Sequence, residues 1–74
     1  MSMVLNSNYA GWLELYSPYS KNKTKLKVGR PGDKVQIISR WVDQGETWVL
    51  ISIYDEFEGW VLAQELSDPS GNEN

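Results

Sequence analysis

The residue types that carry out most side-chain chemistry are missing from this chain, which has 74 residues and contains neither histidine nor cysteine. Their absence excludes a Ser-His-Asp triad, a histidine general base and a metal site built from histidine or thiolate ligands. Asp55, Glu56 and Glu58 form the main cluster of carboxylates, but they lack the spaced ligands and the required glycine of a calcium-binding loop. No GxGxxG or P-loop pattern is present. We therefore expect a protein that is not an enzyme and that uses no metal and no cofactor.

Aromatic side chains are the remaining candidates for function, because nine of the 74 residues are Trp, Tyr or Phe. A domain of this size cannot bury all of them in its core. Trp48 alternates with Val49 and Ile51, so its side chain points to the other side of its strand. Large rings offer contact area at a low cost in conformational entropy. We predict a ligand-binding surface formed by Tyr16, Tyr19, Trp48 and Tyr54. Trp12, Trp41 and Trp60 are candidates to close the open ends of the core, and we expect this role for Trp41 and Trp60.

The stretch 31–66 must position most of these rings, and it alternates apolar and polar residues at the period of a β-strand. Polar turns interrupt the alternation at 43–46 and 55–58, which marks hairpins. The pattern predicts strands at 12–16, 34–42, 47–54 and 59–62, followed by one 3₁₀ turn at 63–66 that buries Leu66. No segment has a helical period. The chain is therefore predicted to be all-β.

The direction of the side chains in 34–42 depends on whether the strand is regular. Val35 and Ile37 are expected to point inward. Ser39 and Trp41 follow on the same side unless a bulge turns them to the other face.

A chain of this length forms one domain, and its core must be hydrophobic because no disulfide can stabilise it. We place the domain at residues 1–66, with 1–8 forming either an edge strand or a loose segment, and a disordered polar tail at 67–74. The core candidates are Leu13, Leu15, Leu26, Val28, Val35, Ile37, Val49, Ile51, Ile53, Val61 and Leu66.

The net charge of −3 argues against nucleic acid as a partner, since affinity for nucleic acid comes from neutralising phosphates. Residues 1–40 carry seven basic and two acidic side chains, whereas residues 41–74 carry eight acidic side chains and no basic ones. Folding can mix these halves on a solvated surface or separate them into two charged faces. The spacing of Lys21, Lys23, Lys25 and Lys27 favours a protected sheet edge over a site for an anionic partner.

The N-terminus has no basic start and no apolar run long enough for a signal peptide. The longest apolar runs, 48–51 and 60–63, are too short to cross a membrane, which takes about 20 residues. We expect a cytoplasmic protein without a membrane span, unless the chain is part of a longer exported protein.

Six short motifs occur in a recognisable order along the chain. They are Leu13-Glu14-Leu15, Ser17-Pro18, Gly32-Asp33-Lys34-Val35, Trp48-Val49-Leu50-Ile51, Gly59-Trp60-Val61 and Leu66. In this order, over 12–66, they resemble the bacterial SH3-like (SH3b) family. The resemblance implies a small five-stranded SH3-like barrel with one 3₁₀ turn near the C-terminus.

The same resemblance implies binding rather than catalysis. Eukaryotic relatives hold proline-rich helices between aromatic side chains of the first long loop, a tryptophan that opens the third strand and a Pro-x-x-Tyr element. Trp48 matches that tryptophan, and Tyr16 and Tyr19 lie near the loop positions. Leu62 and Glu65 replace the proline and the tyrosine, so a proline-rich ligand is not expected. We expect a non-catalytic module that binds a protein or peptide around Trp48.

Two other functions are consistent with the sequence. One is an accessory subunit docked on a larger complex, as SH3-like polypeptides do in photosynthetic electron-transfer assemblies. The other is a cell-wall or glycan-binding module, which would require that the segment comes from an exported protein.

Overall fold

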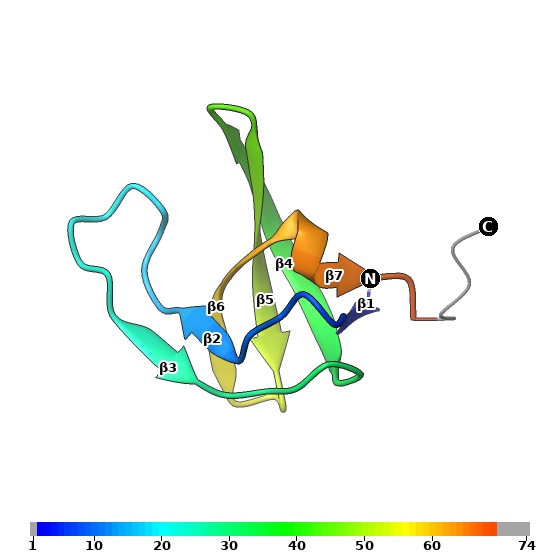
Figure 1. The fold of residues 1–74 in the computed structure, drawn as a ribbon. Helices are drawn as coiled ribbons and strands as arrows, with labels where there is room; N and C mark the ends of the chain where they lie inside the picture. The colour runs from blue at the N-terminus through cyan, green and yellow to red at the C-terminus, as the bar shows by residue number, and fades with distance from the viewer. Residues whose placement is uncertain (1, 70–74) are drawn as a thin grey trace.

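The fold consists of β-strands and a single 3₁₀ turn, as the alternating pattern predicts (Figure 1). The computed structural model describes residues 2–69. Its elements are β1 (Ser2–Leu5), β2 (Trp12–Glu14), β3 (Lys25–Lys27), β4 (Lys34–Asp43), β5 (Glu46–Ile53), β6 (Phe57–Leu62), the 3₁₀ turn η1 (Ala63–Glu65) and β7 (Leu66–Ser67). The prediction of an all-β chain with one such turn near the C-terminus is confirmed.

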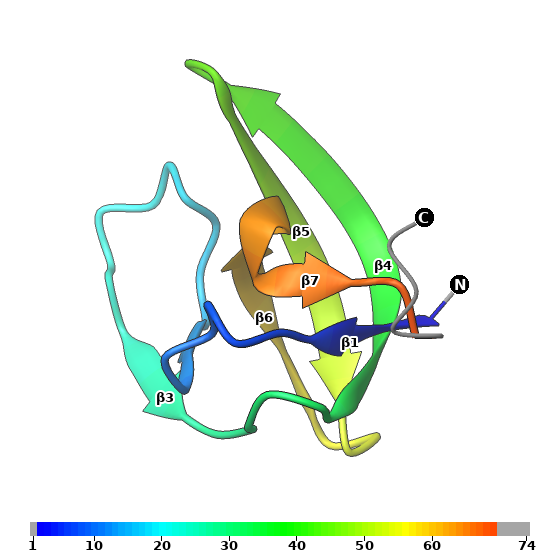
Figure 2. The same cartoon turned by 45° about the vertical axis from the view of Figure 1, so that its right-hand side comes forward.

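In the described part of the chain, all the strands belong to one antiparallel sheet of seven, in the order β3-β2-β6-β5-β4-β1-β7. The sheet curves around the core, but it is not closed into a barrel: within residues 2–69, β3 pairs with β2 alone and β7 with β1 alone (Figures 1 and 2). The prediction of a closed five-stranded barrel is therefore wrong in strand number and in closure. Both edge strands are short, with three residues in β3 and two in β7, and short edge strands leave few unpaired backbone groups for further pairing.

The N-terminal segment contributes one of the additional strands. β1 lies between β4 and β7, with Met3 opposite Val35 and Leu5 opposite Leu66. Leu5 is buried in the core. The segment is thus an interior strand of the sheet rather than an edge strand or a loose end.

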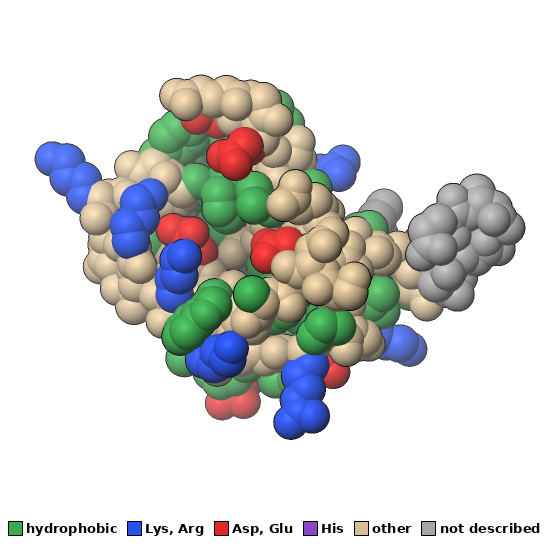
Figure 3. Space-filling model, in the orientation of Figure 1, with side chains coloured by type: hydrophobic (Ala, Val, Ile, Leu, Met, Phe, Trp, Pro, Cys, Tyr) green, Lys and Arg blue, Asp and Glu red, His purple; other side chains and the backbone are tan. Residues whose placement is uncertain are grey.

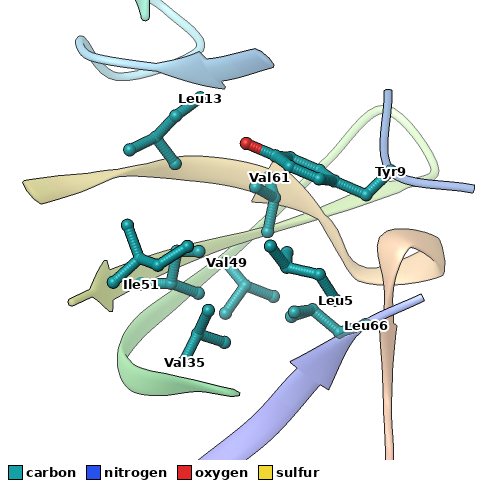
Figure 4. Close-up of a cluster of buried hydrophobic side chains, with 9 residues drawn as sticks. Leu5, Tyr9, Leu13, Val35, Val49, Ile51, Val61 and Leu66 are labelled. Carbon is teal, nitrogen blue, oxygen red and sulfur yellow. The ribbon is translucent and has the colours of Figure 1, made fainter. Parts of the chain in front are cut away.

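The core occupies the inner face of the sheet, where side chains from most of the strands converge (Figure 4). Its buried members are Leu5, Tyr9, Leu13, Val35, Val49, Ile51, Ile53, Val61 and Leu66. Leu15, a core candidate from the sequence, is 36% exposed because β2 ends at Glu14 and the alternation ends with it. Val28 and Ile37 are partly buried against the cluster, and Leu26 is also partly buried.

Tyr9 is a core residue that the strand pattern does not reveal, because it lies between β1 and β2. Its ring is buried and its hydroxyl donates a hydrogen bond of 2.6 Å to the carbonyl of Val28. Burial, together with the nearby charge of Glu65, raises the pKa of Tyr9 to about 12. The phenol therefore remains protonated at neutral pH and keeps this hydrogen bond.

A bulge in β4 changes the direction of every side chain that follows it. Ile37 lies opposite Ile51, but Ser39 lies opposite Leu50, so Ile38 has no partner in the ladder. Val35 and Ile37 point inward, as predicted. After the bulge Arg40, rather than Ser39, lies opposite the buried Val49, and the alternation is reversed.

The C-terminal turn follows the prediction closely. The backbone N–H of Leu62 donates a hydrogen bond of 2.8 Å to Glu65 Oε1, and the turn places Leu66 in the core. Ser67, the first residue of the expected tail, pairs with Val4 in β7. Residues 70–74 of that tail lie outside the described residues.

Candidate functional site

All four tryptophans lie on the outer face of the sheet, opposite the core. Three of them directly precede a buried residue in the same strand: Trp12 before Leu13, Trp48 before Val49 and Trp60 before Val61. Because successive side chains of a strand point to opposite faces, these three rings point outward. The fourth, Trp41, is the cross-strand partner of Trp48, and residues directly opposite one another share a face. We call these four rings, together with Tyr19, the aromatic face.

The tryptophans do not close the ends of the core, so the role expected for Trp41 and Trp60 is wrong. Trp12 is 49% exposed and Trp41 is 45% exposed. Trp48 and Trp60 are half-buried, with Leu62 opposite Trp48 in the ladder. The outer face therefore presents large apolar area to solvent, with the most exposed rings at its sides and the more buried rings in the middle.

A hollow of about 190 Å³ opens in this face between β2, β3, β5, β6 and η1. It is lined by Ala10, Trp12, Glu14, Lys25, Trp48, Trp60, Leu62 and Glu65. In Figure 3 the lysine and arginine atoms on the left cover β3 and the β2–β3 loop, and acidic and hydrophobic atoms lie between them and the β4–β5 hairpin at the top. The hollow thus combines rings with carboxylates.

Charges of both signs border the hollow. Glu14 lies directly opposite Lys25 in the β2–β3 ladder, and the Glu65 carboxylate accepts the hydrogen bond from Leu62. Lys27 Nζ lies 5.0 Å from the centre of the Trp12 ring and donates a hydrogen bond of 3.1 Å to the carbonyl of Ala10. One ring of the aromatic face therefore already contacts a cation, a contact that the electron-rich face of tryptophan favours.

The β2–β3 loop brings Tyr19 onto this face. The Tyr19 ring lies 5.0 Å from the Trp41 ring, and the planes are tilted by 54°. Hydrogen bonding to the Asp43 carboxylate is the main reason that the pKa of Tyr19 is raised. Hydrogen bonds within the loop hold its shape, among them Lys23 Nζ to the carbonyl of Pro18 at 2.8 Å and the Thr24 N–H to Asn22 Oδ1 at 3.0 Å.

The four residues predicted from the sequence to bind a ligand do not lie together. Tyr19 and Trp48 share the aromatic face, linked through Trp41. Tyr16 is exposed at the start of the β2–β3 loop. Tyr54 lies at the other end of β5, six residues from Trp48, which is about 20 Å along an extended strand.

The surroundings of Tyr54 point to a structural role. Tyr54 and Asp55 form the turn between β5 and β6 with φ values of 59° and 53°, the left-handed pair of a type I′ turn. The hydroxyl of Tyr54 donates a hydrogen bond to Asp33 Oδ2, which also accepts one from the N–H of Arg30. This hydrogen bond is also the main reason that the pKa of Tyr54 is raised. Tyr54 therefore joins the turn to the segment before β4.

Several residues of the site were not predicted from the sequence. The outward direction of Trp12 and Trp60 follows from their alternation with Leu13 and Val61, so the strand pattern already contains this signal. The outward direction of Trp41 depends on the bulge at Ile38. Glu65 lies in the predicted 3₁₀ turn, but the pairing of β2 with β6 that brings Glu14 to the same hollow is long-range, and no local pattern indicates it.

Residues 2–69 contain no group of three or more acidic side chains arranged to hold a metal ion. Over the described part of the chain, no helix is long and apolar enough to cross a membrane.

Comparison with known proteins adds no further assignment. No family model matches the chain, and neither the curated proteins nor the solved structures give a significant match.

Proposed function

We propose that this protein is a small, non-catalytic interaction module of the SH3-like type, which binds an extended protein segment across its aromatic face. The observation that supports this most strongly is the position of the tryptophans: all four lie on the face opposite the core, and two are nearly half exposed. Exposed aromatic rings lower the solubility of a protein even where they add nothing to the core. Tryptophan and tyrosine are the residues most enriched where protein partners bind.

The hollow supports a ligand with a basic side chain. Glu14 and Glu65 place two carboxylates beside the rings of the hollow, against the one ammonium group of Lys25. An arginine or lysine of the bound segment can lie over a ring and pair with a carboxylate at the same time. Leu62 and Glu65 lie where the resemblance to SH3-like domains would require proline and tyrosine, so the proposed ligand is not a proline-rich helix.

Titration of the protein with short peptides, monitored by tryptophan fluorescence, tests the proposal. The peptides carry a central arginine, glutamine or glutamate between varied apolar residues, and the arginine series should bind most tightly. Trp12→Ala and Trp41→Ala should each weaken binding about tenfold, because truncating an anchoring ring typically costs more than 1 kcal/mol. Both rings are exposed, so neither variant should unfold the domain.

Val42→Ala is the matched control, since Val42 is 71% exposed and adjoins Trp41 on the opposite face of the hairpin. It should leave peptide affinity unchanged. If Trp12→Ala and Trp41→Ala bind the selected peptides as well as the unmodified protein does, the aromatic face is not the binding surface. Equal affinity for the arginine and glutamate series would remove the charge component of the proposal.

A further inference from the structure

A second cavity lies on the core side of the molecule, among partly buried side chains that pack against the core cluster. Its volume is about 280 Å³, and it lies between β1, β4, β5 and the η1–β7 segment. The lining residues are Met3, Ile37, Arg40, Val49, Ala63 and Leu66. The aromatic face lies on the other side of the sheet, so the two sites are independent.

The chemistry of this cavity is simple. Its lining is apolar except for Arg40, and no acidic side chain of residues 2–69 contributes to it. Within residues 2–69, the Arg40 guanidinium has no hydrogen-bond or ion-pair partner. The cavity therefore offers apolar walls and one unpaired cation, the composition of a site in which a few polar groups orient a mostly apolar ligand.

The bulge at Ile38 creates this arrangement. Because it reverses the alternation, Arg40 lies opposite the buried Val49 and lines the cavity. In a regular strand, Ser39 would take this side, and Arg40 would point to the outer face. The same bulge that turns Trp41 outward thus places a guanidinium beside the core cavity.

We propose that this cavity binds a small apolar carboxylate, an alkyl or aryl acid whose chain fills the apolar part and whose carboxylate pairs with Arg40. A guanidinium presents parallel N–H donors that match the two oxygens of a carboxylate. In another protein a dry cavity of about 150 Å³ holds benzene, so this cavity has room for a longer chain or a substituted ring. The occupant is a small molecule, and the site does not depend on peptide binding at the aromatic face.

Arg40 could instead serve only to cover the core with its aliphatic stem, and the test must separate these roles. Octanoate, octanol and octylamine share a chain length and differ in the head group, and each is titrated while backbone amide shifts are recorded by NMR. Octanoate should give saturable shifts centred on Met3, Ile37 and Leu66, with a dissociation constant on the order of 1 mM. Octanol should bind more weakly and octylamine most weakly.

Arg40→Met retains an apolar stem and removes the charge, so it isolates the role of the guanidinium. It should weaken octanoate binding about tenfold, the loss expected for a charge-assisted hydrogen bond, and leave octanol binding unchanged. Lys34→Met is the control, because Lys34 is exposed on the same strand and does not line the cavity; its octanoate affinity should be that of the unmodified protein.

Three results would overturn the proposal. Octanoate could bind Arg40→Met as tightly as it binds the unmodified protein, which would show that Arg40 only covers the core with its stem. The shifts could fall on Trp12, Trp48 and Trp60, which would place octanoate on the aromatic face. Alternatively, the cavity amides could shift with protein concentration in the absence of octanoate, which would make a second copy of the chain the occupant.

Discussion

The ring of Tyr19 lies 5.0 Å from the ring of Trp41, and this contact connects the β2–β3 loop to the β4–β5 hairpin across the aromatic face. Neither residue is buried. The two segments are far apart in the sheet order, since β2 and β4 are separated by β6 and β5. A side-chain contact between exposed residues therefore shapes the surface that we propose to bind a partner.

Loss of the Trp41 ring should loosen the β2–β3 loop without unfolding the domain. An aromatic pair contributes about 0.5–1.5 kcal/mol beyond its buried area, so Trp41→Ala should lower the free energy of unfolding by about 1 kcal/mol. Urea denaturation measures this change, and ¹⁵N relaxation of residues 16–23 measures loop motion, with Val42→Ala as the control. A loop that stays rigid in Trp41→Ala would show that its internal hydrogen bonds suffice.

Leu13 and Leu15 should respond very differently to the same substitution. Leu13 is 0% exposed and Leu15 is 36% exposed, although both alternate in the same way in the sequence. Leu13→Ala should reduce the free energy of unfolding by about 2–5 kcal/mol, the usual cost of a core truncation. Leu15→Ala should change it by about 0.5 kcal/mol or less, as surface substitutions do. Urea denaturation of the two variants checks this, and equal losses would contradict the end of β2 at Glu14.

Replacing Gly59 by alanine should destabilise the domain. A Cβ atom at this position would lie 2.5 Å from Leu13 Cγ and 2.7 Å from the carbonyl oxygen of Glu14. Since β2 pairs with β6 at this point, Gly59→Ala should lower stability by about 1–3 kcal/mol through overpacking, measured as a reduced thermal midpoint. Gly45→Asn is the comparison, because a Cβ atom there meets nothing within 4 Å and asparagine accepts left-handed φ values. A midpoint for Gly59→Ala equal to that of Gly45→Asn would mean that β2 moves aside freely.

The stability of the domain should fall in strongly alkaline solution through Tyr9. Folding raises the pKa of this phenol from 10.0 to about 12, so the folded state holds the proton more tightly than the unfolded state. The stabilisation is therefore complete below pH 10.0 and is lost as the pH rises towards 12. Urea denaturation across this range should show a smaller decline for Tyr9→Phe.

At neutral pH, Tyr9→Phe should also cost about 1 kcal/mol, because the Val28 carbonyl loses its donor. The raised pKa values of Tyr19 and Tyr54 affect both proteins equally. Parallel declines of the two proteins above pH 10.0 would show that Tyr9 does not control the alkaline loss.

The local alternation of apolar and polar residues predicted much of the sheet. The central hairpin, with Asp43 opposite Glu46, follows from two runs of alternating residues separated by a polar turn. The 3₁₀ turn and the burial of Leu66 also follow from short-range sequence. In contrast, β1 pairs with β4 across some thirty residues of sequence, and no local signal specifies such a partner. The number of strands and the open edge of the sheet were therefore missed.

The sequence by itself determined the all-β class, the lack of histidine and cysteine chemistry, and the outward direction of Trp48, because each depends on composition or on the two-residue period of one strand. Only the tertiary structure decided where Trp41 and Arg40 point. A one-residue bulge at Ile38 reverses the alternation, and its position is set by pairing with β5 rather than by the residues of β4 alone. That single irregularity places a ring on the aromatic face and a guanidinium beside the core cavity.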